Sequence, residues 1–362
     1  MCSFTCVVVH FLAPAPAPFR LAQNQTWASV AIHGHRWSGL TSRQISGWQR
    51  IGAGRDTKGR TTVAGFLEGK AVVITGAGGG IGRACALACA AEGAKVVVAD
   101  IGVGLAGEDP TSAVAEAVVQ EIAGAGGEAV AVAEDVSTMA GGERIVNSAV
   151  ERWGRIDGVV AVAGILRERM LFNMSEDEWD AVIATHLKGH FTVFRHAAAV
   201  MRKQESGSLI GFTSGAFAGS VAQANYSAAK GGIVSLVRSA AVGLHRYGVR
   251  ANAVAPVART RMSANVPMEL AEMGEPEDVA PLVVYLLSDA AADVTGQVYT
   301  AVGGRIAVWN QPVEVREMRT EGRWTPQQIS ERFGEVGQER MGLIDRLEEI
   351  RKAAASGEKP NT

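Results

Sequence analysis

The sequence predicts an α/β fold: a doubly wound, parallel, seven-stranded sheet of the Rossmann type, in a single domain. Three observations predict it. From Lys70 onward, short apolar runs alternate with amphipathic helical patterns, which is typical of a parallel sheet covered on both faces. A glycine-rich turn joins the first run, residues 71–74, to a helical pattern. The second run ends in Asp100, about 20 residues after the turn, where doubly wound folds often carry an acidic residue.

The elements follow one another at regular intervals. The apolar runs predict strands at 70–75, 95–100, 128–133, 158–162, 208–213, 250–254 and 297–301. The helical patterns between them cover 81–92, 112–125, 140–153, 176–202, 222–246 and 277–287. The alternation stops after Gly303 and Gly304, so residues 305–362 are expected to form an extension with short helices. Thr325 and Pro326 are typical of a helix start there.

The turn after the first strand has glycine at positions 76, 80 and 82, a Gly-x-x-x-Gly-x-Gly pattern. Glycine permits the unusual backbone angles of such a turn and lets a phosphate approach the amides at the helix N-terminus. Asp100 is then placed to bind the hydroxyls of an adenosine ribose, and its charge would repel a 2′-phosphate. The pattern therefore predicts a dinucleotide site for NAD rather than NADP.

A second group of residues points to proton transfer. Tyr226 and Lys230 are four residues apart in a helical pattern and so share one face of the helix. A nearby cation favours the phenolate form of a phenol whose pKa is ordinarily about 10, as a general base for alcohol oxidation requires. The preceding strand ends in Thr213 and Ser214, whose hydroxyls reach the same edge of the sheet.

Together these residues resemble the short-chain dehydrogenase/reductase family over residues 67–304. The motifs that carry the resemblance are the glycine turn, Asp135-Val136-Ser137, Tyr226-x-x-x-Lys230, residues 249–256, and Thr295-Gly296-Gln297 followed by Gly303-Gly304. Within the family, residues 98–104, 163–169, 186–191 and 258–262 are similar to (3R)-hydroxyacyl-CoA dehydrogenases of bacterial and peroxisomal β-oxidation.

The resemblance implies a role for each matching residue. Tyr226 would be the general acid/base, and Lys230 would bind the nicotinamide ribose and lower the pKa of the tyrosine. Ser214 would polarise the substrate oxygen, with Thr213 as the alternative. His186 replaces an asparagine that helps to hold a proton-relay water in the family. Besides Tyr226 and Lys230, the implied cofactor contacts are Gly76, Gly80, Ile81, Gly82, Asp100, Asp135, Val136, Ala163, Gly164 and Thr260.

The sequence departs from the family most clearly at residues 161–164, Ala-Val-Ala-Gly, where Asn-Asn-Ala-Gly is usual. The change removes side-chain hydrogen bonds near the cofactor. Four arginines are expected near the mouth of the cleft and have two interpretations, a solvated rim or a site for the phosphates of a CoA thioester. They are Arg167, Arg169, Arg259 and Arg261.

Composition limits the class of protein. The chain has 362 residues, 47% of them hydrophobic, and a formal net charge of −2, which does not suit a nucleic-acid-binding protein. No apolar run approaches the roughly 18 residues of a membrane span, so a cytoplasmic protein without a membrane partner is expected. Cys85 and Cys89 are one helical turn apart and are interpreted as small packing residues, and no metal site is predicted.

Residues 1–62 differ from the rest of the chain. Residues 1–60 contain seven basic residues and a single acid, Asp56, and they show no helical or strand period. Two explanations stay open: a poorly ordered leader, or a true start of translation downstream, for example at Val63. Residues 63–304 are expected to form the dinucleotide-binding catalytic domain.

We therefore expect a NAD-dependent oxidoreductase that transfers a hydride between a secondary alcohol and its ketone, with a 3-hydroxyacyl-CoA as the candidate substrate. One alternative is an NADPH-type ketoacyl reductase, which Asp100 disfavours. The other is a catalytically weak cofactor-binding protein with a regulatory role, which the missing asparagines favour and the intact Tyr226 and Lys230 disfavour. A homo-oligomer, dimer or tetramer, is also expected.

Overall fold

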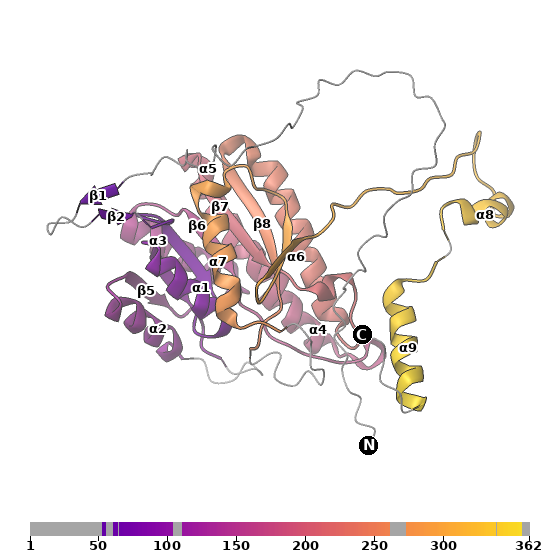
Figure 1. The fold of residues 1–362 in the computed structure, drawn as a ribbon, viewed down its shortest axis with the longest axis horizontal. Coiled ribbons are helices and arrows are strands. Elements are labelled where there is room, and N and C mark those ends of the chain that lie inside the picture. The colour runs from indigo at the N-terminus through magenta and orange to yellow at the C-terminus, as the bar shows by residue number, and fades with distance from the viewer. Residues whose placement is uncertain are drawn as a thin grey trace, which may run out of the picture. The chain divides into compact units, whose positions relative to one another are not determined.

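A computed structural model describes residues 53–55, 61–63, 65–103, 111–260, 273–337 and 339–356. Its main sheet has eight strands in the order β10-β9-β8-β7-β6-β3-β4-β5 (Figure 1). Seven of them run parallel, as predicted: β3 (Ala71–Thr75), β4 (Lys95–Ala99), β5 (Glu128–Val132), β6 (Gly158–Ala161), β7 (Gly207–Phe212), β8 (Val249–Pro256) and β9 (Val298–Val302). The eighth, β10 (Arg305–Val308), pairs antiparallel with β9 and was not predicted. The main sheet thus continues into residues assigned to the extension.

Helices cover both faces of this sheet, and each face has its own apolar core. One core contains residues of α1 (Gly80–Ala91), α2 (Ala113–Gly124) and α7 (Pro276–Leu287). The other contains residues of α3 (Met139–Trp153), α5 (Gly189–Gln204) and α6 (Ala224–Leu244). Successive strand residues alternate between the two, as Val72 and Val73 do. Burial on both faces explains why the strands are nearly continuous apolar runs in the sequence.

The predicted helix at 176–202 is interrupted. It begins as α4 (Glu176–Val182), which Ser175 and Glu178 cap through reciprocal hydrogen bonds. A π-helical segment, Ile183–Lys188, follows and leads into α5. Segments of this kind are rare and are frequently found at functional sites. Here the wider turn contains His186.

Cys85 and Cys89 lie on α1 with their side chains fully buried in the first core. Burial raises the pKa of the Cys89 thiol to about 12 and also raises that of Cys85. Both therefore stay protonated and pack as small apolar side chains, in agreement with their interpretation from the sequence.

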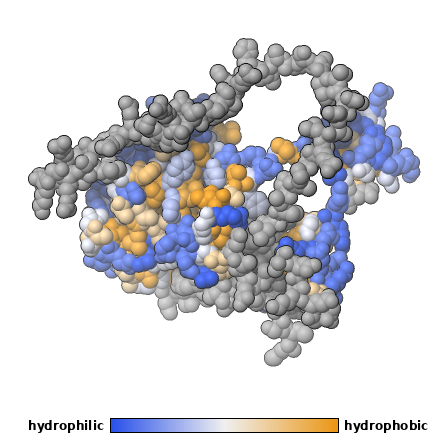
Figure 2. Space-filling model, viewed as in Figure 1, coloured by the Kyte–Doolittle hydropathy of each residue, from blue (hydrophilic) through white to orange (hydrophobic). Residues whose placement is uncertain are grey.

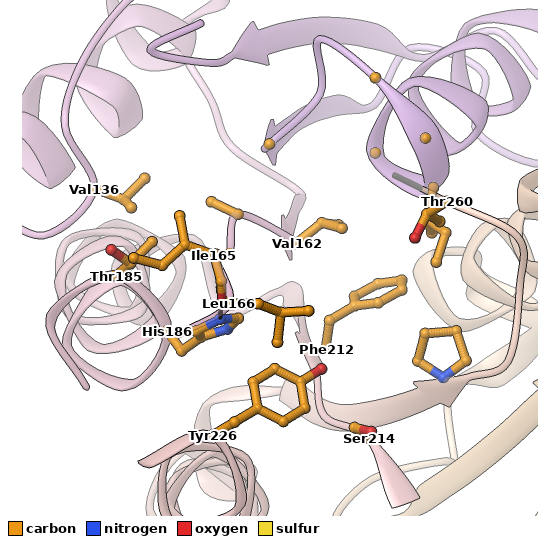
Figure 3. A pocket seen from close by; sticks show the side chains of 18 of the residues that line it. Val136, Val162, Ile165, Leu166, Thr185, His186, Phe212, Ser214, Tyr226 and Thr260 are labelled. Carbon is orange, nitrogen blue, oxygen red and sulfur yellow. Dashed lines mark hydrogen bonds between the residues drawn. The ribbon is translucent and has the colours of Figure 1, made fainter. Parts of the chain in front are cut away.

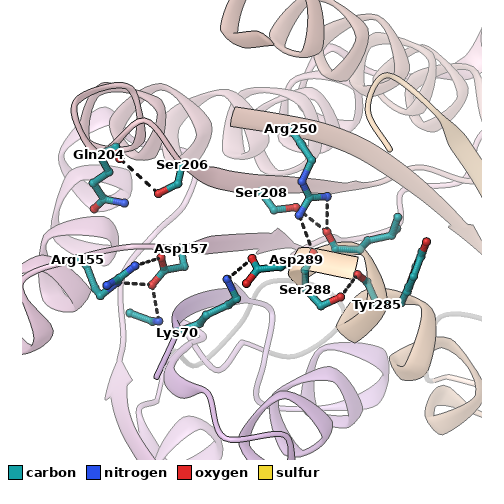
Figure 4. A network of polar contacts seen from close by, with 12 residues as sticks. Lys70, Arg155, Asp157, Gln204, Ser206, Ser208, Arg250, Tyr285, Ser288 and Asp289 are labelled. Atoms are coloured by element: carbon teal, nitrogen blue, oxygen red, sulfur yellow. Dashed lines mark hydrogen bonds and ion pairs between the residues drawn. The ribbon is translucent and has the colours of Figure 1, made fainter. Parts of the chain in front are cut away.

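Polar side chains tie the strands together at the amino-terminal edge of the sheet (Figure 4). Asp157 accepts hydrogen bonds from the main-chain N–H of Ala71 at 2.9 Å and from the Arg155 guanidinium at 2.7 and 2.8 Å. On β8, Arg250 donates to the carbonyl of Leu286 at 2.7 Å. These contacts fix β3, β6 and β8 at the edge opposite the ligand-binding edge of such sheets.

The C-terminal extension contains α8 (Pro326–Arg332) and α9 (Gly342–Ser356). The helix start predicted at Thr325 and Pro326 is confirmed. The Thr325 hydroxyl accepts the N–H of Gln328 at 3.2 Å, and the Gln328 side chain accepts the N–H of Thr325 at 2.9 Å. Figure 2 shows mostly hydrophilic residues over these helices.

The N-terminal region contains β1 (Ala53–Arg55) and β2 (Thr61–Val63), which pair antiparallel in a two-stranded sheet that was not predicted. The rest of residues 1–62 lies outside the described residues, so both explanations for this segment stay predictions. Within the part of the chain that the structure describes, no helix combines the length and the apolar character needed to cross a membrane.

Candidate active site

A cavity of about 480 Å³ opens at the carboxyl ends of the parallel strands (Figure 3). Strand order reverses between β3 and β6 at this point, which is where ligands bind in doubly wound sheets. Every residue predicted for the site lines this cavity: Gly76, Gly80, Ile81, Gly82, Asp100, Asp135, Val136, Ala163, Gly164, His186, Ser214, Tyr226, Lys230 and Thr260.

The turn between β3 and α1 packs closely because its glycines carry no side chain. Gly76 has a φ of +66°, and a Cβ atom there would lie 2.7 Å from the main chain of Ala163. A Cβ atom on Gly82 would overlap the carbonyl oxygen of Gly76. At the start of α1, Gly79 makes no side-chain capping contact. The first amides of this helix therefore suit a phosphate group.

Asp100 follows β4, and two main-chain N–H groups fix its carboxylate. Gly78 donates to one oxygen at 2.8 Å and Gly102 donates to the other at 2.7 Å. Because each carboxylate oxygen has two lone pairs, both can accept a further hydrogen bond. Arg83, the arginine of α1, is ion-paired with Glu121 of α2. This end of the cavity thus presents an anchored carboxylate whose neighbouring arginine already has a partner.

Three more of the residues predicted for the cofactor follow β5 and β8. The Asp135 carboxylate accepts hydrogen bonds from the N–H and the hydroxyl of Ser137, both at 2.8 Å, and Val136 lines the cavity beside it. Thr260 faces the glycine turn, since a Cβ atom on Gly80 would lie 3.6 Å from its methyl group. The predicted residues are therefore brought together from widely separated parts of the sequence.

The Thr75 side chain holds the segment in which the two asparagines are absent. Ala161 ends β6 and is buried in the second core, while Val162 lines the cavity. The Thr75 hydroxyl, at the end of β3, accepts the N–H groups of Val162 at 3.2 Å and Ala163 at 3.4 Å. Hydrogen bonds between adjacent strand ends therefore position this segment without asparagine side chains.

The structure distinguishes the two candidate hydroxyls after β7. Thr213 is buried, and its hydroxyl donates to the main-chain carbonyl of Lys230 at 2.8 Å. The Ser214 side chain lies beside the Tyr226 hydroxyl, as Figure 3 shows, and it lowers the pKa of the tyrosine. Of the two candidates, Ser214 is thus the one whose side chain lies beside the tyrosine, while the Thr213 hydroxyl is directed to the main chain.

Tyr226 and Lys230 lie on one face of α6, as the spacing predicted. The Lys230 ammonium lies 5.3 Å from the centroid of the Tyr226 ring and donates to the carbonyl of Phe212 at 2.7 Å. The pKa of Tyr226 is raised to about 12, mainly by burial; the Ser214 side chain acts to lower it and the charge of Glu168 acts to raise it. Burial lowers the pKa of Lys230 to about 7.

The lower tyrosine pKa expected from the sequence is therefore not observed. The reason is geometric as well as energetic: the ammonium lies over the ring, where it contacts the carbonyl of Phe212, and desolvation outweighs the other effects on Tyr226. Both groups favour their neutral forms in this structure.

His186 packs edge-on against Tyr226, with ring centroids 5.2 Å apart and an interplanar angle of 87°. Its Nε2 lies 2.7 Å from the carbonyl oxygen of Ile165, and Gly164 leaves room for the ring. Burial, followed by the charge of Lys230, lowers the pKa of His186 well below its usual range, so the ring is neutral. Its Nδ1 is buried and has no partner among the described residues.

Two residues near Tyr226 were not predicted. Glu168, in the segment after β6, and Gln223, which precedes α6, both line the cavity. The Gln223 side chain donates to the Glu168 carboxylate at 2.5 Å. Before Gln223, Ala222 has a φ of +58°, which residues other than glycine rarely adopt. The signal that could have identified Gln223 is its position one helical turn before Tyr226.

Two of the four arginines expected near the cleft mouth have acidic partners. Arg169 is paired with Glu178 at 2.7 Å, and Arg259 is paired with Glu275 at 3.0 Å. Arg261 lies outside the described residues. The ion pairs reduce the positive charge that a phosphate group would meet here, and they favour the interpretation of these two arginines as part of a solvated rim.

Comparison with known proteins agrees with this geometry. A family model described as enoyl-(acyl carrier protein) reductase matches residues 76–305. Hydroxyacyl-CoA dehydrogenase ChsB1 of Mycobacterium tuberculosis is 43% identical over 288 residues, which cover 75% of this chain and 89% of that protein. The 3-oxoacyl-[acyl-carrier-protein] reductase of Synechocystis is 39% identical over 250 residues, which cover 66% of this chain and 98% of that protein.

The fold has a close relative among solved structures. The crystal structure of a short chain dehydrogenase from Mycobacterium avium has a TM-score of 0.68 and 46% sequence identity, over 76% of this chain and 98% of that one. The family-model match, residues 76–305, includes every residue that lines the cavity. The chain belongs to the short-chain dehydrogenase/reductase family and is an oxidoreductase that transfers a hydride between an alcohol and a ketone.

Proposed function

We propose that this protein is a NAD-dependent dehydrogenase of 3-hydroxyacyl thioesters. The observation that carries the proposal is that Ser214, Tyr226 and Lys230 lie together in one cavity. The same cavity also contains the glycine turn and Asp100. Under this proposal the cofactor occupies the part of the cavity with the glycine turn, and the substrate occupies the part beside Tyr226. The name of the M. tuberculosis relative, a hydroxyacyl-CoA dehydrogenase, supports the thioester class.

In this mechanism Tyr226 is the general acid/base. As the phenolate, Tyr226 takes the hydroxyl proton of the substrate during oxidation; as the neutral phenol, the form that burial favours, it gives its proton to the ketone oxygen during reduction. The Ser214 hydroxyl donates a hydrogen bond to the same substrate oxygen and stabilises its developing charge. The nicotinamide cofactor, when bound, accepts the hydride from the carbinol carbon or supplies it to the ketone. Apolar residues, among them Val162 and Phe212, line the cavity and limit the entry of water.

Lys230 and His186 support proton transfer in this proposal. Lys230 holds the nicotinamide ribose from its position next to the Tyr226 ring. His186 holds a water molecule through Nδ1 and so replaces the asparagine of the family. The burial of this nitrogen without a partner among the described residues supports the assignment, because buried polar atoms are usually hydrogen-bonded.

The residues at the other end of the cavity fit a dinucleotide. The close packing at Gly76 and Gly82 leaves no room for side chains, and the Asp100 carboxylate can still accept hydrogen bonds. We propose NAD because the charge of Asp100 would repel a 2′-phosphate. The rival is an NADPH-dependent ketoacyl reductase, which the similarity to an acyl-carrier-protein reductase favours.

Reduction of NAD and NADP, followed by absorbance, tests the proposal with 3-hydroxybutyryl-CoA, a steroid alcohol and a sugar alcohol. We expect the fastest reaction with NAD and the thioester. Asp100→Ala should narrow the preference for NAD, whereas Asp180→Ala, on an exposed face of α4, should leave it unchanged. A preference for NADP in the parent protein would refute the cofactor assignment. If no substrate is oxidised with either NAD or NADP, the result would instead favour a catalytically weak regulatory protein.

A homo-oligomer and a cytoplasmic location are the remaining parts of the proposal. Light scattering on the purified protein tests the first, and a monomer at micromolar concentration would contradict it. Microscopy of the tagged full-length chain tests the second, and a signal confined to another compartment would contradict it.

A further inference from the structure

A second histidine, His190, is buried next to the site, and the mechanism above does not use it. It is the second residue of α5, four residues after His186, and is only 1% exposed. Its ring lies against β7, because a Cβ atom on Gly211 would be 3.4 Å from the His190 Cδ2 atom. A polar ring buried at such a place needs hydrogen-bond partners. Both of its nitrogens have one.

The two partners of His190 are main-chain groups. Its Nδ1 lies 2.6 Å from the carbonyl oxygen of His186, and its Nε2 lies 3.1 Å from the main-chain nitrogen of Phe212. A carbonyl oxygen only accepts a hydrogen bond, and a main-chain N–H only donates one. Nδ1 therefore carries the proton, and Nε2 accepts the N–H of Phe212. Burial, followed by the charge of Lys230, lowers the pKa of His190 to about 3, so this neutral form persists at neutral pH.

Each partner leads directly to a residue of the proposed mechanism. The carbonyl that accepts Nδ1 belongs to His186 itself, so the hydrogen bond fixes the main chain of the π-helical segment at this residue. Phe212 is the last residue of β7, and its carbonyl accepts the Lys230 ammonium at 2.7 Å. One buried ring therefore joins the helical turn that carries His186 to the strand end that holds Lys230.

We infer that His190 is a positioning residue, which holds His186 and the end of β7 in the arrangement that proton transfer and the ribose contact of Lys230 require. The inference rests on the roles of His186 and Lys230 in the proposed function. Without the ring, the His186 carbonyl loses a donor and the Phe212 N–H loses a side-chain acceptor, so the two segments are no longer tied to each other. A misplacement of about 1 Å in an active site can lower the rate by about 100-fold.

Three substitutions of His190 separate its two contacts. His190→Leu removes both. In His190→Asn the amide nitrogen lies the same number of bonds from the main chain as Nδ1, so it can still donate to the His186 carbonyl. In His190→Gln the amide oxygen takes the place of Nε2, so it can still accept the Phe212 N–H. Met201→Val is the control, because it removes fully buried apolar packing near the other end of α5 and no side-chain hydrogen bond.

The first measurement is the oxidation of 3-hydroxybutyryl-CoA by NAD in H₂O and in D₂O, with rates corrected for the folded fraction. In His190→Leu we expect kcat to fall about 10- to 100-fold, with KM for the thioester within about twofold, because neither contact touches the substrate. The solvent isotope effect on kcat should rise, since proton transfer becomes slower relative to the other steps. His190→Asn and His190→Gln should each recover part of the loss, and they replace His190→Leu as the test if that variant does not fold.

Met201→Val should lower the thermal midpoint and leave kcat, KM and the isotope effect unchanged. A kcat equal to that of the parent protein in all three His190 variants would overturn the inference. A lower kcat with an unchanged isotope effect would also overturn it, because that result indicates a purely structural role.

A fluorescence titration without substrate separates this inference from the proposed function. It uses whichever of NADH and NADPH the parent protein binds more tightly. His190→Leu and His190→Asn lose the contact with Phe212 and should bind the cofactor several-fold more weakly, whereas His190→Gln should bind it like the parent protein. If the parent protein does not oxidise the thioester, the proposed function is refuted, and the titration still decides the role of His190. Equal affinity in the parent protein and His190→Leu would overturn that role.

Discussion

Burial acts in opposite directions on the two groups that α6 brings together. It raises the pKa of Tyr226 to about 12 and lowers that of Lys230 to about 7, so each favours its neutral form. The four-residue spacing was enough to predict that both side chains share a face. It gave no measure of the desolvation that each side chain undergoes, because desolvation depends on packing from β7, the π-helical segment and the strand ends.

Tyr226→Phe should reduce turnover by roughly 100- to 10,000-fold, the usual contribution of general acid–base catalysis, because it removes the hydroxyl that transfers the proton. Cofactor affinity should stay within about twofold, since the ring still fills its place beside His186. Steady-state rates and a fluorescence titration with the cofactor measure the two effects. Tyr285→Phe, on an exposed part of α7, is the control. Near-normal turnover would show that another group transfers the proton.

Lys230 should make the free energy of unfolding depend on pH. Its pKa is about 7 in the folded protein and about 10.5 in the unfolded chain, so the unfolded state binds more protons between these values. Stability should therefore rise as pH increases from about 7 to 10.5. Lys230→Met should flatten this slope in urea unfolding measured at several pH values, whereas Lys203→Met, on an exposed position, should not. An equal slope in parent and Lys230→Met would contradict the lowered pKa.

The glycine turn and the π-helical segment contribute to the site in different ways. The turn is defined by missing side chains, and glycine spacing in the sequence reports such gaps directly. The π-helical segment has no comparable signal, because residues 176–202 have the apolar spacing of one continuous helix. Its extra residue places His186 against Gly164, a contact that depends on the tertiary structure.

Gly82→Ala should lower both stability and cofactor affinity. The added Cβ would overlap the carbonyl oxygen of Gly76, and overpacking of this kind costs about 1–3 kcal/mol. Gly243→Ala is the matched substitution, because a Cβ near the end of α6 meets nothing within 4 Å and should stabilise the helix by up to about 1 kcal/mol. Thermal unfolding and cofactor titration of both variants measure the contrast. Equal stability of the two variants would show that the turn tolerates a side chain.

At the scale of the whole molecule, the sequence predicted the parts of the fold that depend on burial. Seven apolar runs became the seven parallel strands because both faces of the sheet are covered. Residues 305–308 form an edge strand in which three of the four side chains are exposed, so their pairing does not follow from burial and escaped prediction. Similarly, the sequence could not tell which of Thr213 and Ser214 faces Tyr226, because that depends on how the end of β7 packs against α6 in the folded protein.

The N-terminal region bears on the last prediction: a chain that begins at Val63 should fold and turn over substrate as well as the full chain. The first strand of the main sheet, β3, begins at Ala71, and β1 and β2 pair only with each other among the described residues. Residues 1–60 also show no apolar period and carry a net positive charge, whereas the rest of the chain is acidic. Their removal should therefore leave both apolar cores intact. Thermal midpoints and NAD-linked rates of the two chains test this, and a large fall in either after truncation would show that the N-terminal region stabilises the enzyme.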